Sequence, residues 1–266
     1  MSKLPAISRA GHIVLGAFIC LSIASCAPHT KRNGRTIDWL IKHPDQIKPE
    51  EREGVARYKE EFLPPDPLSH EQEFKLAKHN GIATDVMLEV LKISGGSAAQ
   101  LKNCSDSPYR PVAGINVPPI TDESKFEPLR KSLKKRGYDL FITQQGQVDR
   151  CGLMRTTDPF VIVKTMGTSG PNYGVGTDDV IAKLKEWQKT MPLDIVGAAD
   201  DLLYVRFNRP SGKSAELANE INKFCPDAVS QGTSLESDDG DDSEAAGLRR
   251  LTEHIDKNDV VCFWWD

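Results

Sequence analysis

Apolar residues recur at helical spacing through much of the first half of the chain. This spacing predicts helices near residues 49–61, 69–79 and 85–93, the last of them capped by Thr84. Residues 39–103 are therefore expected to form a mostly helical N-terminal region.

Residues 104–157 are expected to form an αβ lead-in segment. Their proline-rich beginning, over 104–123, predicts irregular structure. Apolar positions at helical spacing over 126–133 then predict a helix, and alternating positions over 138–142 predict a strand.

The last part of the chain, residues 158–266, alternates between the two periodicities. The run Phe-Val-Ile-Val-Lys at 160–164 predicts a buried strand. Further strands are expected over 193–199, 202–207 and 260–265, with helices over 177–191, 217–225 and 248–255. The order strand, helix, strand, strand, helix, helix, strand is similar to a ferredoxin-like split βαβ arrangement with one added helix. The predicted fold class is α+β.

The N-terminus has the features of a secretory leader. An apolar run over 13–23 follows a short basic stretch and is too short to span a bilayer stably. The segment Ile-Ala-Ser-Cys ending at Cys26 resembles the bacterial lipobox, in which the cysteine carries the lipid. We expect a lipoprotein signal peptide over 1–25, and a lipidated Cys26 with its tether over 26–38. Plain secretion with cleavage after Ala27, or a buried apolar helix, are the alternatives.

Lipidation would determine the location of the protein. Two or more acyl chains hold a protein stably on a membrane. Ala27 stands where an aspartate favours retention in the inner membrane. We therefore expect a bacterial envelope protein, lipid-anchored in the outer membrane and facing the periplasm, whose first partner is the membrane.

The charge balance argues against nucleic acid as a partner. The 266 residues carry 34 Lys and Arg against 38 Asp and Glu, a net charge of -4. A nucleic-acid-binding domain is usually strongly basic.

Four cysteines remain after the leader and the lipid site are set aside. In an oxidising envelope they can form disulfides, and four cysteines allow three connectivities. Cys104 and Cys151 lie in polar contexts and are the first candidates for a pair. Cys225 and Cys262 fit a helix end and a strand, as small buried residues.

Motifs for cofactor or metal chemistry are incomplete in this sequence. The glycine-rich loop over 167–176 lacks the Gly-Lys-Ser/Thr of a phosphate-binding loop, and the acidic run over 236–244 fails the calcium-loop pattern. The histidines are not spaced as metal ligands, so we expect neither a metal nor a cofactor. Cys225 with Asp227 and His254 is the one candidate catalytic set, that of a cysteine-dependent enzyme.

Three segments together resemble one known family. They are listed here in chain order: Thr-Ser-Gly-Pro-Asn-Tyr at 168–173, Phe-Cys-Pro-Asp at 224–227, and Trp-Trp-Asp at 264–266. Their combination is similar to the DUF4253 family, a domain of unknown function, over about residues 158–266. The resemblance implies candidate binding residues, or residues that maintain the fold, at Asn172, Tyr173, Trp264, Trp265 and Asp266. Strand alternation places the two tryptophans on opposite faces of a sheet.

These features together predict a lipid-anchored envelope protein whose C-terminal domain is a binding module for a protein or a small ligand. An immunity-like binding of a toxin is one specific form of this hypothesis. The alternatives are a cysteine-dependent enzyme using Cys225, or a structural envelope lipoprotein.

Overall fold

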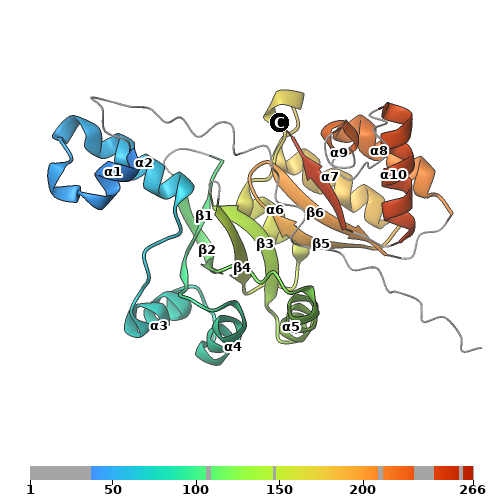
Figure 1. Ribbon diagram of the computed structural model, residues 1–266. Coiled ribbons are helices and arrows are strands. Elements are labelled where there is room, and N and C mark those ends of the chain that lie inside the picture. Colours follow the sequence, from blue (N-terminus) through green and yellow to red (C-terminus); the bar gives the residue numbers. More distant parts are fainter. Residues whose placement is uncertain are drawn as a thin grey trace, which may run out of the picture.

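The computed structural model describes residues 37–105, 109–145, 148–208, 212–230, 243–257 and 260–265 (Figure 1). The signal peptide, Cys26, most of its tether, the acidic run up to residue 242 and Asp266 lie outside these residues.

The described residues form helices and one sheet. The helices are α1 Ile37–Lys42, α2 Arg52–Phe62, α3 His70–His79, α4 Thr84–Ser94, α5 Glu123–Lys135, α6 Pro159–Met166, α7 Thr177–Gln188, α8 Ser214–Phe224, α9 Asp227–Ser230 and α10 Glu244–Asp256. The short 3-10 turns are η2 Pro44–Gln46, η3 Pro49–Glu51 and η4 Pro171–Tyr173. The strands are β1 Ala99–Asn103, β2 Arg110–Val117, β3 Asp139–Gln145, β4 Val148–Met154, β5 Leu193–Ala198, β6 Leu202–Phe207 and β7 Val260–Trp264.

These strands make a seven-stranded sheet in the order β1-β2-β4-β3-β5-β6-β7. Neighbouring strands are antiparallel except β3 and β5, which run parallel and share one register pair, Ile142 with Gly197. The sheet therefore consists of an N-terminal half and a C-terminal half that meet at the β3–β5 pair.

Helices cover both faces of the sheet (Figure 1). One core joins α3, α4 and α5 to the first face, with Phe126 and Leu133 of α5 fully buried. The larger core joins α6 to α10 to the second face and is rich in aromatic rings, including Trp187, Phe263 and Trp265. Among the described residues, none of the helices has both the length and the apolar character that crossing a bilayer requires.

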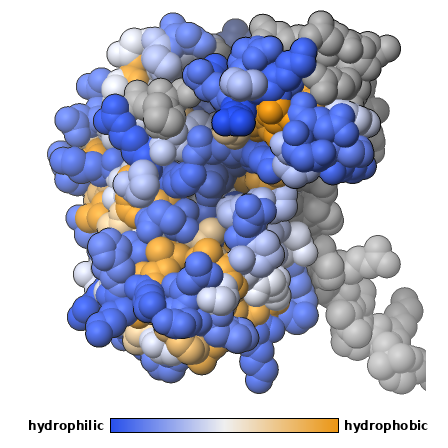
Figure 2. All heavy atoms as spheres, turned by 90° about the vertical axis from the view of Figure 1, so that its left-hand side faces the viewer, coloured by the Kyte–Doolittle hydropathy of each residue, from blue (hydrophilic) through white to orange (hydrophobic). Residues whose placement is uncertain are grey.

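The helices α1 and α2 lie to one side, near the edge strand β1, where Lys102 pairs with Glu60 of α2 at 2.5 Å. Figure 2 looks onto this side and shows hydrophobic residues gathered in its lower half, at the height of α3 and α4. The exposed hydrophobic residues of these two helices include Phe74 and Leu88, which are 40% and 44% exposed.

The α+β class is confirmed, and so are the helices predicted in the N-terminal region. The predicted cap of α4 is wrong, because Thr84 is its first residue and Ala83 occupies the N-cap position without a side-chain hydrogen bond. The split βαβ order of the C-terminal domain is wrong, because its first strand is the helix α6. Asp158 caps this helix by accepting a hydrogen bond from the N–H of Phe160 at 2.9 Å, and Pro159 occupies the first helical position. Gly167 ends it with a left-handed φ of 71°. These signals at both ends outweigh the β-branched run between them.

The lead-in segment also differs from the prediction. The proline-rich stretch expected to be irregular contains the strand β2, with Pro111 near its start and Gly114 at a φ of 114°. A Cβ on Gly114 would lie 2.9 Å from the backbone oxygen of Leu153, so this position requires glycine.

Candidate functional site

The loop that follows α6 connects the family segments. The Thr168 hydroxyl donates to the carbonyl of Ala199 at 2.5 Å, and the Ser169 N–H donates to the carbonyl of Asp200 at 2.8 Å. A bridge between Gly170 and Val175 closes the loop around η4. The loop is thus fixed on the β5–β6 turn by backbone and buried hydroxyl contacts.

Gly170 lies flat against the indole ring of Trp265. A Cβ at Gly170 would lie only 2.4 Å from Cδ1 of that ring, so a larger residue cannot replace the glycine without a shift. Trp265 is 2% exposed and donates its Nε1–H to the carbonyl of Phe224 at 3.4 Å. The first family segment, over 168–173, is therefore in direct contact with the last one, over 264–266. The middle segment, over 224–227, contacts the last one through the carbonyl of Phe224.

The middle segment is held in the same place. The hydroxyl of Tyr173 donates to Oδ2 of Asp227 at 2.7 Å, and the Cys225 thiol donates to the carbonyl of Trp264 at 3.3 Å. Asp227 is 6% exposed and Cys225 is fully buried. These contacts assign Cys225, Asp227 and Trp265 to maintaining the fold.

Other motif residues reach the surface. Asn172 is exposed, the Tyr173 side chain is 42% exposed, and Trp264 is half-buried on the opposite sheet face to Trp265. Trp264 donates its Nε1–H to Oδ2 of Asp201 at 3.3 Å. Asp266, the remaining candidate, lies outside the described residues.

The structure removes the support for Cys225 as a nucleophile. Burial raises the pKa of this thiol to about 12, so it is protonated at neutral pH. A thiolate in an open cleft would be needed for catalysis. His254 lies half-buried on α10. The Cys225 thiol donates its hydrogen bond to the backbone carbonyl of Trp264.

The structure does not form the predicted disulfide between Cys104 and Cys151. Cys104 follows Asn103, which pairs with Arg110 at one end of β2, whereas Cys151 pairs with Val117 at the other end. Seven strand positions at about 3.3 Å each separate these ends by roughly 23 Å. A disulfide requires Cα atoms within about 7 Å of each other.

A cleft that the sequence did not reveal lies on the first face of the sheet, between α5 and the strands β5, β6 and β7. It has a volume of about 90 Å³, and its lining includes Ile142, Val196, Tyr204 and Val260 from four strands. Phe126 of α5 and Ile120 also line it. This lining makes the cleft mostly apolar.

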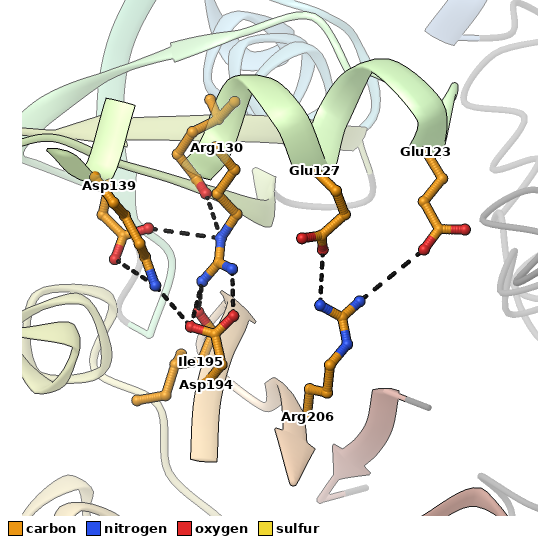
Figure 3. A network of polar contacts seen from close by, with 9 residues as sticks. Glu123, Glu127, Arg130, Asp139, Asp194, Ile195 and Arg206 are labelled. Atoms are coloured by element: carbon orange, nitrogen blue, oxygen red, sulfur yellow. Dashed lines mark hydrogen bonds and ion pairs between the residues drawn. The ribbon is translucent and has the colours of Figure 1, made fainter. Parts of the chain in front are cut away.

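Charged groups surround the apolar floor. Glu123, Glu127 and Asp149 are acidic, and Arg206 of β6 is the basic group facing them. Arg206 binds Glu127 at 3.0 Å and lies 4.0 Å from Glu123 (Figure 3). Arg150 belongs to the lining too, but its side chain turns to the opposite face to bond Asn116. The side chains around the cleft therefore carry a net negative charge.

One end of α5 is joined to both halves of the sheet by Arg130 (Figure 3). This buried guanidinium donates to the carbonyl of Leu140 on β3 at 3.0 Å, and to the Asp194 carboxylate and the Ile195 carbonyl of β5. Burial would raise the pKa of Asp194, but the hydrogen bonds and charge of Arg130 outweigh it and hold this pKa at about 2. These contacts fix the helix that forms the cleft wall.

Asp139 belongs to the same network but is less well paired. Burial raises its pKa to about 6, against the attraction of Arg130 and Lys134, each 3.6 Å away. Its Oδ1 has no hydrogen-bond partner in the described part of the chain. Asp139 is therefore a buried carboxylate that titrates above the usual range.

Residues 150–266 match the family described as Domain of unknown function (DUF4253), which confirms the predicted resemblance for the C-terminal half of the chain. No curated protein and no solved structure matches this chain. The family segments of this half are the ones that meet at Trp265.

Proposed function

We propose that this chain is a lipid-anchored envelope protein whose C-terminal half, together with α5, forms a binding module. The cleft beside α5 is its ligand site. The observation that carries this proposal is an apolar floor from four strands enclosed by three carboxylates, with Arg206 as the basic side chain that faces them. Ligand sites in proteins are typically apolar hollows with a few polar groups that orient the ligand.

The charges around the cleft favour one chemical class of ligand. A small apolar body fits the floor, while an attached ammonium group would be attracted by Glu123 and Asp149 at the rim. A carboxylate in the same position would be repelled. The ligand class is therefore an apolar amine, either free or displayed by a partner molecule.

Binding can be measured with two probes of similar shape and opposite charge. Phenethylamine should raise the thermal unfolding midpoint of the full chain saturably, whereas 3-phenylpropionate should not. Val260→Trp fills the cleft and should abolish the effect. The matched control is Val161→Trp on α6, where the valine is 38% exposed on the other side of the sheet. Equal binding of both probes, or binding that survives Val260→Trp, would refute the site.

The proposed lipid anchor at Cys26 requires a separate test. Labelled palmitate should enter the wild-type chain in bacterial cells and should be absent from Cys26→Ser, which should leave the membrane fraction. A purified native protein that keeps its initial methionine and carries no lipid would refute the anchor, without affecting the cleft.

A further inference from the structure

The neighbouring helices α3 and α4 expose large apolar side chains. Phe74 of α3 is 40% exposed, and Leu88 and Ile93 of α4 are 44% and 36% exposed. The buried sides of the same helices share one core, to which α3 contributes Ala77 and α4 contributes Val90. Figure 2 shows hydrophobic residues gathered on the surface at the height of these two helices. Apolar patches of this kind mark places where a protein contacts a partner molecule or a membrane.

Both helices carry the same pattern of an exposed apolar residue and a lysine. Lys78 follows Phe74 by four positions, and Lys92 follows Leu88 by four positions. Residues four positions apart lie on the same side of a helix. Both lysines are exposed, and neither has an ion-pair partner in the part of the chain that the structure describes. The α3–α4 surface is defined here as Phe74, Leu88, Ile93, Lys78 and Lys92.

The acidic residues on the outside of α3 and α4 are already paired. Glu71 of α3 binds Lys75 at 2.6 Å. Asp85 and Glu89 of α4 each bind Arg136, which follows α5, at 2.6 Å. The two lysines of the α3–α4 surface therefore give it a positive charge that no neighbouring carboxylate on these helices compensates.

The described chain begins on the same side of the molecule. Ile37 is the first residue of α1, and α1 lies on the side of the molecule that Figure 2 faces, as α3 does (Figure 1). The ten residues between Cys26 and Ile37 span at most about 40 Å when fully extended. A lipid on Cys26 would therefore keep this side of the molecule close to the bilayer.

We infer that the α3–α4 surface docks onto the anionic phospholipids of the membrane that holds the lipid of Cys26. This inference rests on the proposed lipid anchor and adds a fixed orientation to it. The apolar side chains enter the boundary between headgroups and acyl chains, as those of an amphipathic surface helix do. The lysine stems lie along this boundary, and their ammonium groups bind the lipid phosphates.

The test measures vesicle binding by the full chain carrying Cys26→Ser, so that no attached lipid contributes. Vesicles of phosphatidylglycerol and phosphatidylcholine in equal parts should bind this parent chain saturably in a sedimentation assay. Sodium chloride should weaken this binding, and vesicles of phosphatidylcholine alone should bind the chain far less. Lys78→Gln combined with Lys92→Gln should weaken binding to the anionic vesicles roughly thirtyfold.

The control for this pair of changes has the same net charge. Lys189→Gln combined with Lys223→Gln alters exposed lysines beside α7 and on α8, the helices that cover the other face of the sheet. This control should bind the anionic vesicles as the parent chain does. Residues 1–36 are identical in every variant, so their own affinity for lipid contributes equally to all of them.

A second measurement does not depend on the lysines. Phe74→Trp in the parent chain places an indole ring in the α3–α4 surface. Brominated phospholipids in the anionic vesicles should quench the fluorescence that this ring adds. Val161→Trp is the matched control, because the valine is 38% exposed on the other side of the sheet, and its added fluorescence should not be quenched.

The inference is overturned if the Lys78 and Lys92 variant binds anionic vesicles as tightly as the control pair, or if Phe74→Trp shows no added quenching. It is also overturned if the surface joins two copies of the chain, so that Leu88→Ser abolishes a dimer without weakening vesicle binding. Wild-type chain without palmitate would refute only the proposed anchor, because the vesicle assay uses unlipidated chain. Phenethylamine binding should persist in all these variants.

Discussion

The hydroxyl of Tyr173 donates a hydrogen bond of 2.7 Å to the buried carboxylate of Asp227, 54 positions along the chain. The contact joins an exposed loop to the turn that contains Cys225, directly beside the place where Gly170 lies on Trp265. The family segments therefore pack against one another and fix the loop of residues 168–176 to the end of the sheet.

Tyr173→Phe should lower the stability of the folded chain by removing this hydrogen bond. The change removes the donor and leaves a carboxylate that is 6% exposed without it, so we expect a loss of about 1–3 kcal/mol in the free energy of unfolding. Urea unfolding measures the loss. Asn172→Ala, on the exposed side of the same turn, should stay within about 0.5 kcal/mol of wild type. Equal stability of Tyr173→Phe and wild type would show that the hydrogen bond contributes nothing.

Arg130→Met should be more costly. It removes the guanidinium that joins α5, β3 and β5, and leaves Asp194 and Asp139 with Lys134 as the remaining cation in contact with them. Breaking such a buried pair costs about 3–5 kcal/mol, whereas Arg136→Met at the surface should cost less than about 1 kcal/mol. If the two variants unfold at the same urea concentration, Arg130 does not hold the sheet halves together.

The two aspartates beside Arg130 predict opposite effects of pH on stability. The pKa of Asp194 is lowered from 3.8 to about 2, so its contribution is complete above pH 4 and is lost on acidification towards pH 2. The pKa of Asp139 is raised from 3.8 to about 6, so its contribution is present below pH 4 and is lost as the pH rises to 6.

Asp139→Asn should therefore remove the fall in stability between pH 4 and pH 6. Urea midpoints measured across this interval should be flatter for the variant than for wild type. Asp194→Asn should instead lose stability at every pH above 4. A wild-type stability that rises steadily from pH 4 to pH 6, with no change in Asp139→Asn, would contradict the assignment.

The family match does not define a folding unit. It begins at residue 150, within β4, while β3 lies between β4 and β5 in the sheet and precedes the match. A fragment of residues 150–266 would lack both β3 and the helix α5. It should show no cooperative thermal transition by circular dichroism, whereas a fragment of residues 109–266 should show one. Cooperative unfolding of the shorter fragment would refute this boundary.

The cysteines of the folded chain should differ in reactivity. Cys225 is fully buried with a pKa of about 12, so iodoacetamide at pH 8 should leave it unmodified in the folded chain and alkylate it in urea. Cys104 and Cys262 are half-buried and serve as internal references, which should react faster. Rapid native alkylation of Cys225, detected by peptide mass spectrometry, would restore the cysteine-dependent enzyme as a candidate.

The sequence predicts local structure well where helical periodicity agrees with a signal at a helix end, as in α3, which Ser69 caps, and α8, which ends before Pro226. It fails at α6, because the run Phe-Val-Ile-Val favours a strand until Asp158 and Gly167 are recognised as the two helix ends. It also misses β2 and β4, since Pro111, Gly114 and Gly152 interrupt their apolar pattern.

The family segments could be recognised from sequence, but the cleft beside α5 could not. The cleft depends on the parallel β3–β5 pair, which is a long-range contact without a local signal. The sequence of α5 carries one indication of the cleft. Its charged residues form a stripe at helical spacing beside the apolar one, and they are Glu123, Glu127, Arg130 and Lys134.

The most direct test of the central claim maps phenethylamine onto the full chain by amide chemical shifts. Saturable shifts should concentrate at Phe126, Ile142, Tyr204 and Val260 and should spare the loop of residues 168–176. Shifts confined to Asn172 and Tyr173, or the absence of any saturable shift, would contradict a ligand site beside α5.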